Sequence, residues 1–278
     1  MIVSSDRVLS NRPFNDAPIG IFDSGFGGLT VAREIAKELP EESIVYFGDT
    51  ARCPYGPRSQ DEVDGFVQQI CTWLVGRDVK LLVIACNTAT AAGLEHAQQR
   101  FSIPVIGAVI PGARAGCYPQ AIRNIDAGIT VFSTATPKFV DIVEQGIRMS
   151  RGPIEDLTSL ASKVYIRPAF QEIARDYLEP LRRCEIDTLV LGCTHYPMLK
   201  ALIGGVIGHN VLLVSSAEEM AKEVRETLSM RGELAHEGNI AKHEFFTSAP
   251  NLDEFQSFGS RVFSEPIERP THIDLSRL

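Results

Sequence analysis

Short apolar runs alternate along this chain with longer segments in which apolar residues recur every three or four positions. Pro18–Phe22 and Leu81–Ala85 are runs of the first kind, and Leu29–Leu39 and Asp61–Gly76 are segments of the second kind. Short apolar runs are typical of strands covered on both faces, and the longer period is typical of amphipathic helices. The alternation predicts an α/β protein built on a mainly parallel sheet with covering helices.

The same pattern predicts the elements of the rest of the chain. Further strands are expected at Ser43–Phe47, Pro104–Ala108, Gly128–Phe132, Thr188–Gly192 and His243–Thr247, and further helices at Ala89–Arg100, Phe170–Arg183, Ala217–Arg231 and Leu252–Phe258, with others beginning at Lys138 and Pro197. Pro111–Gly112 marks a predicted crossover. We therefore predict a flexible extension at residues 1–17, one lobe of residues 18–108 plus 214–278, a second lobe of residues 109–213, and a cleft between the lobes.

Two of the predicted strands end in the same way, on a cysteine followed by small polar residues. Leu81–Ala85 runs into Cys86, Thr188–Gly192 runs into Cys193, and the two segments align without a gap. Residues just past the carboxyl end of a parallel strand lie where open α/β sheets bind ligands. The repeat would place one thiol in each lobe, on opposite sides of the cleft. That geometry suits the transfer of a proton between the two faces of a carbon atom.

The position of these cysteines favours chemistry over packing. Taken singly, either one could be a small buried core residue. Each, however, precedes a predicted helix, and the dipole and free N–H groups of a helix N-terminus stabilise a thiolate and lower its pKa. We therefore predict catalytic roles for Cys86 and Cys193 and structural roles for the remaining cysteines.

The polar neighbours of the cysteines have two alternative roles. His195 could tune the pKa of Cys193 or supply a proton, or it could be a hydrogen-bonded structural histidine. Asn87, Thr88 and Thr194 could cap their helices, or the same hydroxyl and N–H groups could hold a substrate carboxylate. These roles do not exclude each other.

The loop after the first strand, Asp23–Gly28, stands where a dinucleotide-binding fingerprint would stand but does not match one. Its glycines lack the Gly-x-Gly-x-x-Gly spacing, and Asp23 would repel a pyrophosphate. An acidic residue at that point is better suited to a substrate ammonium group, although Asp23 could equally be a helix cap. Asp49 and the turn Pro54–Gly56 could complete the wall of such a site.

The composition excludes several classes of partner. The chain has 278 residues, of which 44% are hydrophobic, and a net charge of −8 with no block rich in Lys and Arg. Nucleic acids and anionic membranes are therefore not expected partners, and no apolar stretch approaches the length of a bilayer span. The six cysteines form no Cys-x-x-Cys pair, so no metal site is expected. The first residues do not resemble a signal peptide, which predicts reduced thiols in the cytoplasm.

Four motifs together resemble the glutamate racemase family, whose members are cofactor-independent enzymes that supply D-glutamate for bacterial peptidoglycan. The matching stretches are Gly20–Val31, Gly48–Gly56, Ile84–Ala89 and Leu189–Pro197, in the order found in the family. The resemblance implies two pseudo-symmetric α/β lobes that hold glutamate between them. It implies no cofactor, and it allows a homodimer.

The resemblance also implies roles for individual residues. Cys86 and Cys193 would be the two catalytic acid/bases, one removing the α-proton of glutamate and the other delivering a proton to the opposite face. Asp23 and His195 would assist this transfer. The residues implied to line the substrate are Asp23, Ser24, Pro54, Tyr55, Gly56, Asn87, Thr88, Thr194 and His195, with Asp49, Glu144 and Thr134 as lesser candidates.

Two alternative functions remain open on the sequence. The chain could be another racemase of the same superfamily, acting on aspartate or a hydantoin, although the residues that flank the cysteines favour glutamate. It could also be a weakly active relative that binds an acidic amino acid or a protein partner. The second lobe motivates this alternative because it departs from the family pattern. A strand and turn are missing between Gly116 and Pro137, residues 148–167 look like an insertion, and Ile110 stands where the family usually has a glutamate. The presence of both cysteines argues against it.

Overall fold

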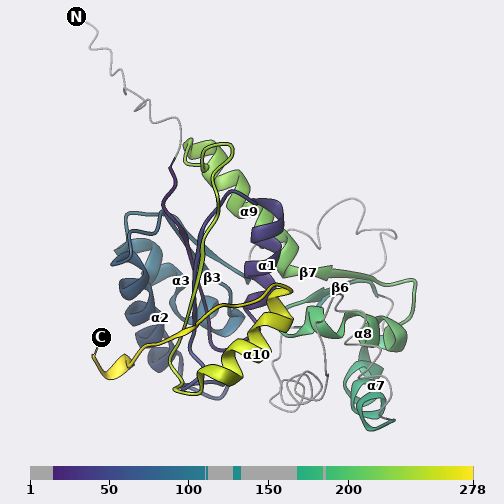
Figure 1. The fold of residues 1–278 in the computed structure, drawn as a ribbon. Helices are drawn as coiled ribbons and strands as arrows, with labels where there is room; N and C mark the ends of the chain where they lie inside the picture. The colour runs from purple at the N-terminus through teal and green to yellow at the C-terminus, as the bar shows by residue number, and fades with distance from the viewer. Residues whose placement is uncertain (1–14, 110, 112–127, 133–167, 184–185, 278) are drawn as a thin grey trace, which may run out of the picture.

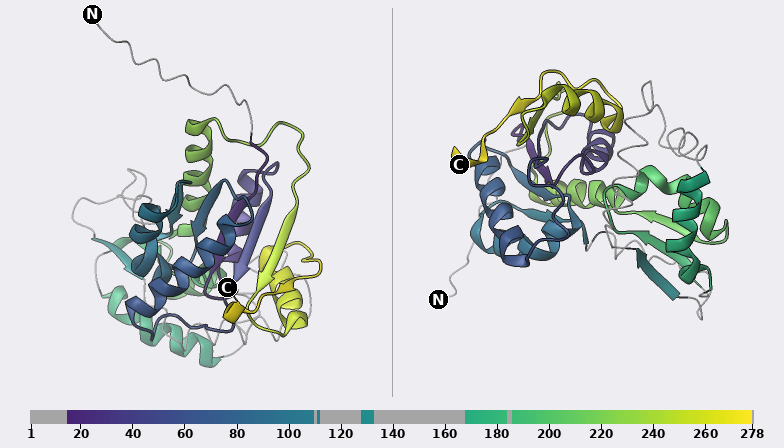
Figure 2. Two further views of the ribbon diagram at one scale, coloured as in Figure 1. Left: turned by 90° about the vertical axis from the view of Figure 1, so that its left-hand side faces the viewer. Right: turned by 90° about the horizontal axis from the view of Figure 1, so that it is seen from below.

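Two parallel sheets organise the chain, and each has helices beside it (Figure 1). The structure is a computed structural model that describes residues 15–109, 111, 128–132, 168–183 and 186–277. Within these residues, one sheet has six strands and the other has three. Figure 2 shows the two sheets and their helices side by side. The arrangement confirms the predicted α/β class.

The strands follow the predicted alternation closely. In spatial order the larger sheet contains β4 (Val105–Gly107), β3 (Leu81–Ile84), β1 (Ile19–Asp23), β2 (Ile44–Gly48), β8 (His243–Thr247) and β9 (Thr271–His272). The smaller sheet contains β5 (Gly128–Phe132), β6 (Ile186–Leu191) and β7 (Leu212–Ser215). Neighbouring strands are parallel throughout both sheets.

The helices stand between these strands in the chain. They are α1 (Leu29–Glu38), α2 (Gln60–Val75), α3 (Asn87–Arg100), α7 (Pro168–Arg182), α8 (Lys200–Ile207), α9 (Ser216–Arg231) and α10 (Leu252–Phe263), with short 3-10 helices η1 (Tyr196–Leu199) and η2 (Leu275–Arg277). Among the described residues, no helix has both the length and the apolar character needed to cross a bilayer.

The larger sheet is apolar on both faces because alternate residues of its strands enter two different cores. Ile19 and Ile21 of β1 are fully buried in the core shared with α1, α9 and α10, whereas Phe22 is buried in the core shared with α2 and α3. Side chains alternate between the faces of a strand, so a strand covered on both sides needs apolar residues at every position. This explains the continuous apolar runs in the sequence.

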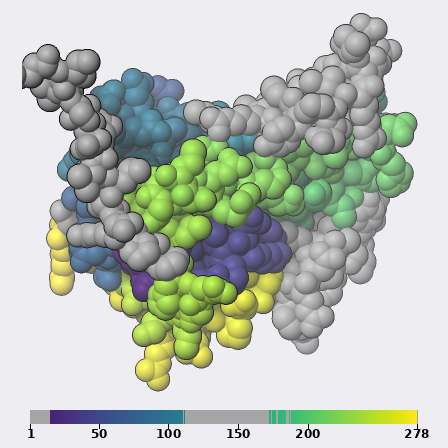
Figure 3. All heavy atoms as spheres, turned by 90° about the horizontal axis from the view of Figure 1, so that it is seen from above, coloured from purple at the N-terminus to yellow at the C-terminus, as the bar shows by residue number. Residues whose placement is uncertain are grey.

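Helix α9 links the two sheets. It follows β7 of the smaller sheet directly, yet it packs against α1 on the larger sheet. Figure 3 shows the yellow-green atoms of this part of the chain against the purple atoms of the N-terminal part. Strand β8 then pairs with β2, so the C-terminal part of the chain returns to the first sheet. The predicted lobe boundary at residue 214 falls inside β7, and the division into lobes remains a prediction.

The sequence pattern missed two strands and simplified one helix. The apolar run of β7 spans only Val211–Val214 and follows closely on the helix expected from Pro197, whereas β9 has two residues and no apolar run. The helix expected from Pro197 is the 3-10 helix η1 followed by α8, because the chain tightens into a turn at the proline before the α-helix begins. The helix expected from Lys138 lies outside the described residues.

Candidate active site

The carboxyl ends of β1 and β6 bring together polar side chains from the two sheets. Asp23 is the last residue of β1, and Thr194 lies in the turn that follows β6. Thr194 Oγ1 donates a hydrogen bond to Asp23 Oδ1 at 3.4 Å, and both residues are buried. The contact joins the two sheets at the edge where ligands bind in parallel α/β folds.

Two glycines in the loop after β1 make this approach possible. A Cβ atom on Gly27 would overlap Thr194 Oγ1 and lie 2.7 Å from the His195 ring. A Cβ atom on Gly28 would overlap the Asp23 side chain. Only residues without a side chain fit at these distances. The glycine pair therefore allows the close packing of the two loops.

Cys86 occupies the junction between β3 and α3. It is the N-cap of α3, it is 7% exposed, and its Sγ donates a hydrogen bond to Ser24 Oγ at 3.5 Å. The next residue, Asn87, begins the helix, and its Oδ1 is buried without a hydrogen-bond partner in the described part of the chain. Thr88 follows in the first turn and is half-buried. This junction therefore combines a thiol, a hydroxyl and an unpaired amide oxygen.

Cys193 has a different local setting. Its Sγ lies 3.7 Å from Nδ1 of His195, and both side chains are buried. The backbone N–H of Tyr196 donates to the Cys193 carbonyl at 3.1 Å, so a tight turn follows the cysteine before η1 begins. The two cysteines therefore share a position at a strand end but not a helix-capping geometry.

Burial dominates the acidity of both thiols. Burial, aided by the neighbouring Asp23 and opposed by the Ser24 hydroxyl and backbone N–H groups, raises the pKa of Cys86 to about 11. It raises the pKa of Cys193 to about 12, against the opposing effect of the backbone N–H groups of His195 and Tyr196. The expectation of lowered thiol pKa values is wrong. The N–H groups act in the expected direction, but the loss of water around each sulfur has the larger effect.

Burial also shifts the pKa values of Asp23 and His195, in each case in favour of the neutral form. It raises the pKa of Asp23 and lowers the pKa of His195, and each group opposes the shift of the other. Asp23 Oδ2 also accepts the N–H of Gly25 at 2.9 Å. Nε2 of His195 has no hydrogen-bond partner among the residues described. The site therefore gathers four titratable groups in a poorly hydrated setting, which suits proton transfer.

The loop after β2 fixes Tyr55 through Asp49. The fully buried Asp49 carboxylate accepts hydrogen bonds from the Tyr55 hydroxyl, from Arg52 Nε at 2.6 Å and from Ser248 Oγ at 2.7 Å. Its oxygen atoms are thus occupied by protein donors, and its role in this geometry is to position the loop. Arg52 and Ser248 gave no signal in the sequence.

The remaining predicted site residues are more exposed or are not described. Pro54 and Gly56 flank Tyr55 and are exposed. Glu144 and Thr134 lie outside the described residues, as does the segment 148–167.

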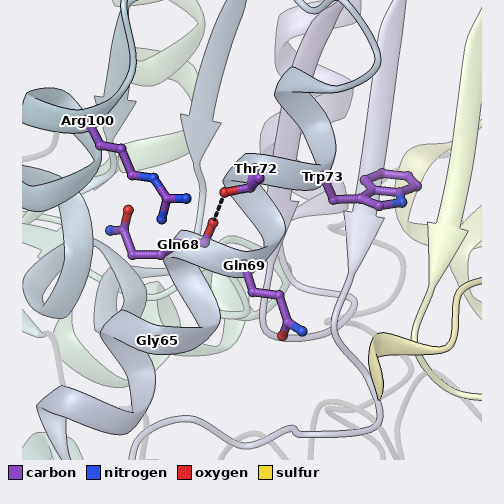
Figure 4. Close-up of a pocket in the computed structure, with 6 residues that line it drawn as sticks. All are labelled: Gly65, Gln68, Gln69, Thr72, Trp73 and Arg100. Carbon is purple, nitrogen blue, oxygen red and sulfur yellow. Dashed lines mark hydrogen bonds between the residues drawn. The ribbon is translucent and has the colours of Figure 1, made fainter. Parts of the chain in front are cut away.

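A separate groove lies on the outer side of α2 and α3 (Figure 4). It has a volume of about 410 Å³ and is lined by Gly65, Gln68, Gln69, Thr72, Trp73 and Arg100. None of these residues belongs to the predicted site. The groove and the paired cysteines are therefore distinct features of the molecule.

Comparisons with known proteins identify the family. Residues 27–224 match the family model described as Asp/Glu/Hydantoin racemase. The chain belongs to this racemase family. A relative from Bacillus cereus named glutamate racemase is 39% identical, over 93% of this chain and 97% of the relative. A racemase of the same name from Exiguobacterium sibiricum is 40% identical, over 90% of this chain and 93% of the relative.

Solved structures of racemases extend the similarity to three dimensions. A glutamate racemase isoform from Bacillus anthracis aligns with a TM-score of 0.77 and 37% identity, over 93% of this chain and 98% of that chain. The glutamate racemase from Thermus thermophilus, solved with beta-chloro-D-alanine, aligns with a TM-score of 0.79 and 32% identity, over 95% of this chain and 99% of that chain. The family resemblance drawn from the four motifs is thereby confirmed.

Proposed function

We propose that this protein is a cofactor-independent glutamate racemase. The observation that carries the proposal is the meeting of two loops, one from each sheet, that place Asp23 against the turn Cys193–His195, with Cys86 hydrogen-bonded to Ser24 beside them. The names of the relatives at 39–40% identity support glutamate as the substrate. A glutamate racemase from Francisella tularensis has been solved with D-glutamate, which supports an acidic amino acid as the ligand of this fold.

The reaction moves one proton off the α-carbon and another onto its opposite face. One cysteine thiolate takes the α-proton and becomes a thiol, while the electron pair left on carbon is delocalised into the α-carboxylate. The thiol of the other cysteine then delivers its proton from the opposite side and becomes a thiolate. Atoms and charge balance, and the two cysteines exchange roles in the reverse direction. Cys86 and Cys193 are the residues proposed for these steps.

Asp23 and His195 are proposed to prepare the two thiols. Asp23 lies close enough to Cys86 to influence its pKa, and the His195 ring is 3.7 Å from the sulfur of Cys193. Because burial keeps both thiols protonated, a base must accept a proton before catalysis begins. A neutral imidazole beside Cys193 and a carboxylate beside Cys86 provide that base on each side.

The substrate is proposed to bind polar groups at the ends of β1, β3 and β6. The unpaired Oδ1 of Asn87 is an acceptor for the substrate ammonium group, and the hydroxyl of Ser24, which accepts from Cys86, is a donor for a substrate carboxylate. The hydroxyl proton of Thr194 is donated to Asp23, so Thr194 Oγ1 offers the substrate an acceptor. Donors aimed at the α-carboxylate also stabilise the negative charge that develops there. Thr88 and the turn Pro54–Gly56 complete the proposed lining.

The cellular setting follows from the proposed reaction. We propose that the product D-glutamate supplies peptidoglycan synthesis, that the protein works in the cytoplasm, and that it forms a homodimer. Sedimentation velocity tests the last point directly.

A related racemase is the second candidate, because the family description includes aspartate and hydantoin substrates. Proton NMR in deuterated water separates these functions. Incubated with L-glutamate or D-glutamate and no added cofactor, the protein should remove the α-proton signal and produce the other enantiomer. Exchange of aspartate alone would instead identify the sister activity.

The single substitutions Cys86→Ser and Cys193→Ser test the mechanism in the same assay. Each should abolish racemisation and preserve the circular dichroism spectrum, because serine is similar in size but far less acidic. Full activity in either variant would refute the two-base assignment.

A further inference from the structure

The buried hydroxyl of Thr30 joins α1 to the turn that carries Cys193. Thr30 is fully buried, and its Oγ1 lies 2.8 Å from the Gly27 carbonyl oxygen and 3.1 Å from the Thr194 carbonyl oxygen. The first contact is local to the start of α1. The second connects the helix that follows β1 to the loop that follows β6, across the two sheets.

The Thr194 carbonyl oxygen lacks the backbone N–H donor that the neighbouring carbonyls of its turn have. In the turn after β6, the N–H of Tyr196 bonds to the Cys193 carbonyl, and the N–H of Met198 bonds to the His195 carbonyl. The same spacing would pair the Thr194 carbonyl with the backbone nitrogen of residue 197. That residue is Pro197, which has no N–H. A buried carbonyl without a donor is unfavourable. The Gly27 carbonyl already accepts the backbone N–H of Thr30 at 3.0 Å, so the single hydroxyl proton of Thr30 is available to the Thr194 carbonyl.

The Thr30–Thr194 contact also lies beside two distances within the site. Thr194 stands between the residues whose Sγ and Nδ1 atoms are 3.7 Å apart, and its own Oγ1 reaches Asp23 at 3.4 Å. Gly27 leaves no space between the loops. A shift of the Thr194 backbone would therefore change both distances together.

We propose that Thr30 is a positioning residue for the racemase reaction. Its hydroxyl replaces the missing N–H of Pro197 at the Thr194 carbonyl and so fixes the turn Cys193–His195 against Asp23. The inference rests on the proposed function but names a residue that touches neither thiol.

Three substitutions test the proposal through kcat and KM for both enantiomers. Thr30→Val keeps the shape and removes the hydroxyl, and kcat should fall by about ten- to a hundredfold, the effect expected when a buried carbonyl loses its donor. Thr30→Ser keeps the hydroxyl and should retain most of the activity. The double substitution Thr30→Val with Pro197→Ala restores an N–H at position 197, and kcat should recover substantially relative to Thr30→Val alone.

A control substitution removes a comparable bond elsewhere. Thr72→Val deletes the hydroxyl that donates to the Gln68 carbonyl at 2.6 Å within α2 and should leave kcat unchanged. Urea denaturation of every variant shows whether lost activity reflects unfolding. A kcat of Thr30→Val within twofold of the unsubstituted protein, or no recovery in the double variant, would overturn the proposal.

A second readout does not depend on turnover. The ring resonances of His195, assigned by NMR with a His195→Gln variant, should move in Thr30→Val and return toward their original positions in the double variant. Unmoved resonances would also overturn the proposal. Failure of the proposed function is distinguishable, because it would appear as an unsubstituted protein without α-proton exchange, in which the His195 resonances still report on Thr30.

Discussion

At the scale of single residues, burial decides the chemistry of the paired thiols. Both sulfur atoms lie next to backbone N–H groups that favour the thiolate, yet removal from water raises the pKa of Cys86 to about 11 and that of Cys193 to about 12. The position of each cysteine at a strand end could be predicted from the sequence. The direction of the pKa shift could not, because it depends on how deeply tertiary packing buries each sulfur.

These raised pKa values predict a loss of stability in alkali. Each thiol has an ordinary pKa of 9.0 and a higher pKa in the folded protein. Below pH 9.0 the thiol is protonated in both states, and its contribution to the free energy of unfolding is fully present. Above pH 9.0 the unfolded state ionises first, so this contribution is lost as the pH rises toward the folded pKa. Between pH 9 and 11, each thiol should reduce the free energy of unfolding by about 1.4 kcal/mol per pH unit. Urea denaturation at pH 8, 9.5 and 10.5 measures this, with the Cys86→Ser/Cys193→Ser variant as control. Identical pH dependence in the two proteins would contradict it.

The substitution Asp23→Asn separates catalysis from loop structure. In asparagine, Oδ1 can still accept the Gly25 N–H, and the amide N–H can donate to Thr194 Oγ1, which reverses the direction of that bond. Because both contacts can be kept in this way, the free energy of unfolding should change by only about 1 kcal/mol. It removes the proton-accepting carboxylate, and kcat should fall by about a hundredfold or more. An unchanged kcat would reduce Asp23 to a loop cap.

At the scale of elements, the amino ends of the strands are joined by a buried ion pair. Lys80 precedes β3 and Glu42 precedes β2, and their side chains lie 2.5 Å apart with almost no exposure. Lys80 Nζ also donates to the carbonyls of Asn15 and Glu233, and Glu42 accepts the N–H of Ala235. The pair thus ties together the start of the larger sheet and the segment after α9.

Breaking this pair should destabilise the protein strongly. Lys80→Met leaves the Glu42 charge buried and uncompensated, and the free energy of unfolding should fall by about 3–5 kcal/mol. The double substitution Lys80→Met/Glu42→Leu removes both charges and should cost less than Lys80→Met alone. Urea denaturation provides the measurement. A double variant less stable than Lys80→Met would show that the hydrogen bonds of Glu42 matter more than its charge.

The elements themselves were largely predictable, whereas the contacts between them were not. Strand β8 has the bounds expected from its apolar run, α1 ends one residue before its expected end, and α2 begins and ends one residue earlier than expected. Those signals are local and periodic. The contacts of Thr30 with Thr194 and of Ser248 with Asp49 join residues far apart in the chain, through single polar atoms, and no periodic pattern encodes them.

At the scale of the whole molecule, the proposed substrate should hold the two sheets together. The residues proposed to bind it come from the loops after β1, β2, β3 and β6, so binding requires both sheets in place. A ligand that binds only the folded state at about 100 times its Kd stabilises that state by about 2.7 kcal/mol. For a chain of this size, the corresponding rise in Tm is roughly 5–10 °C.

Thermal unfolding of the Cys86→Ser variant measures this effect without conversion of the ligand. D-glutamate should raise Tm, and D-aspartate at the same concentration should raise it less. An equal rise with both amino acids would indicate a site that does not select chain length, in favour of the broader substrate range of the family.

The burial of the two thiols also determines which kind of covalent inhibitor can reach them. Electrophilic reagents attack thiolates, and a buried thiol with a raised pKa offers little thiolate to a reagent that arrives from solvent. Of the cysteines that the structure describes, Cys53 alone is half-buried, and Cys71, Cys86 and Cys193 are buried. A general alkylating agent would therefore be a poor probe of the catalytic pair. A selective inhibitor should carry its electrophile on an acidic amino acid, so that the proposed binding groups deliver it to the sulfur atoms.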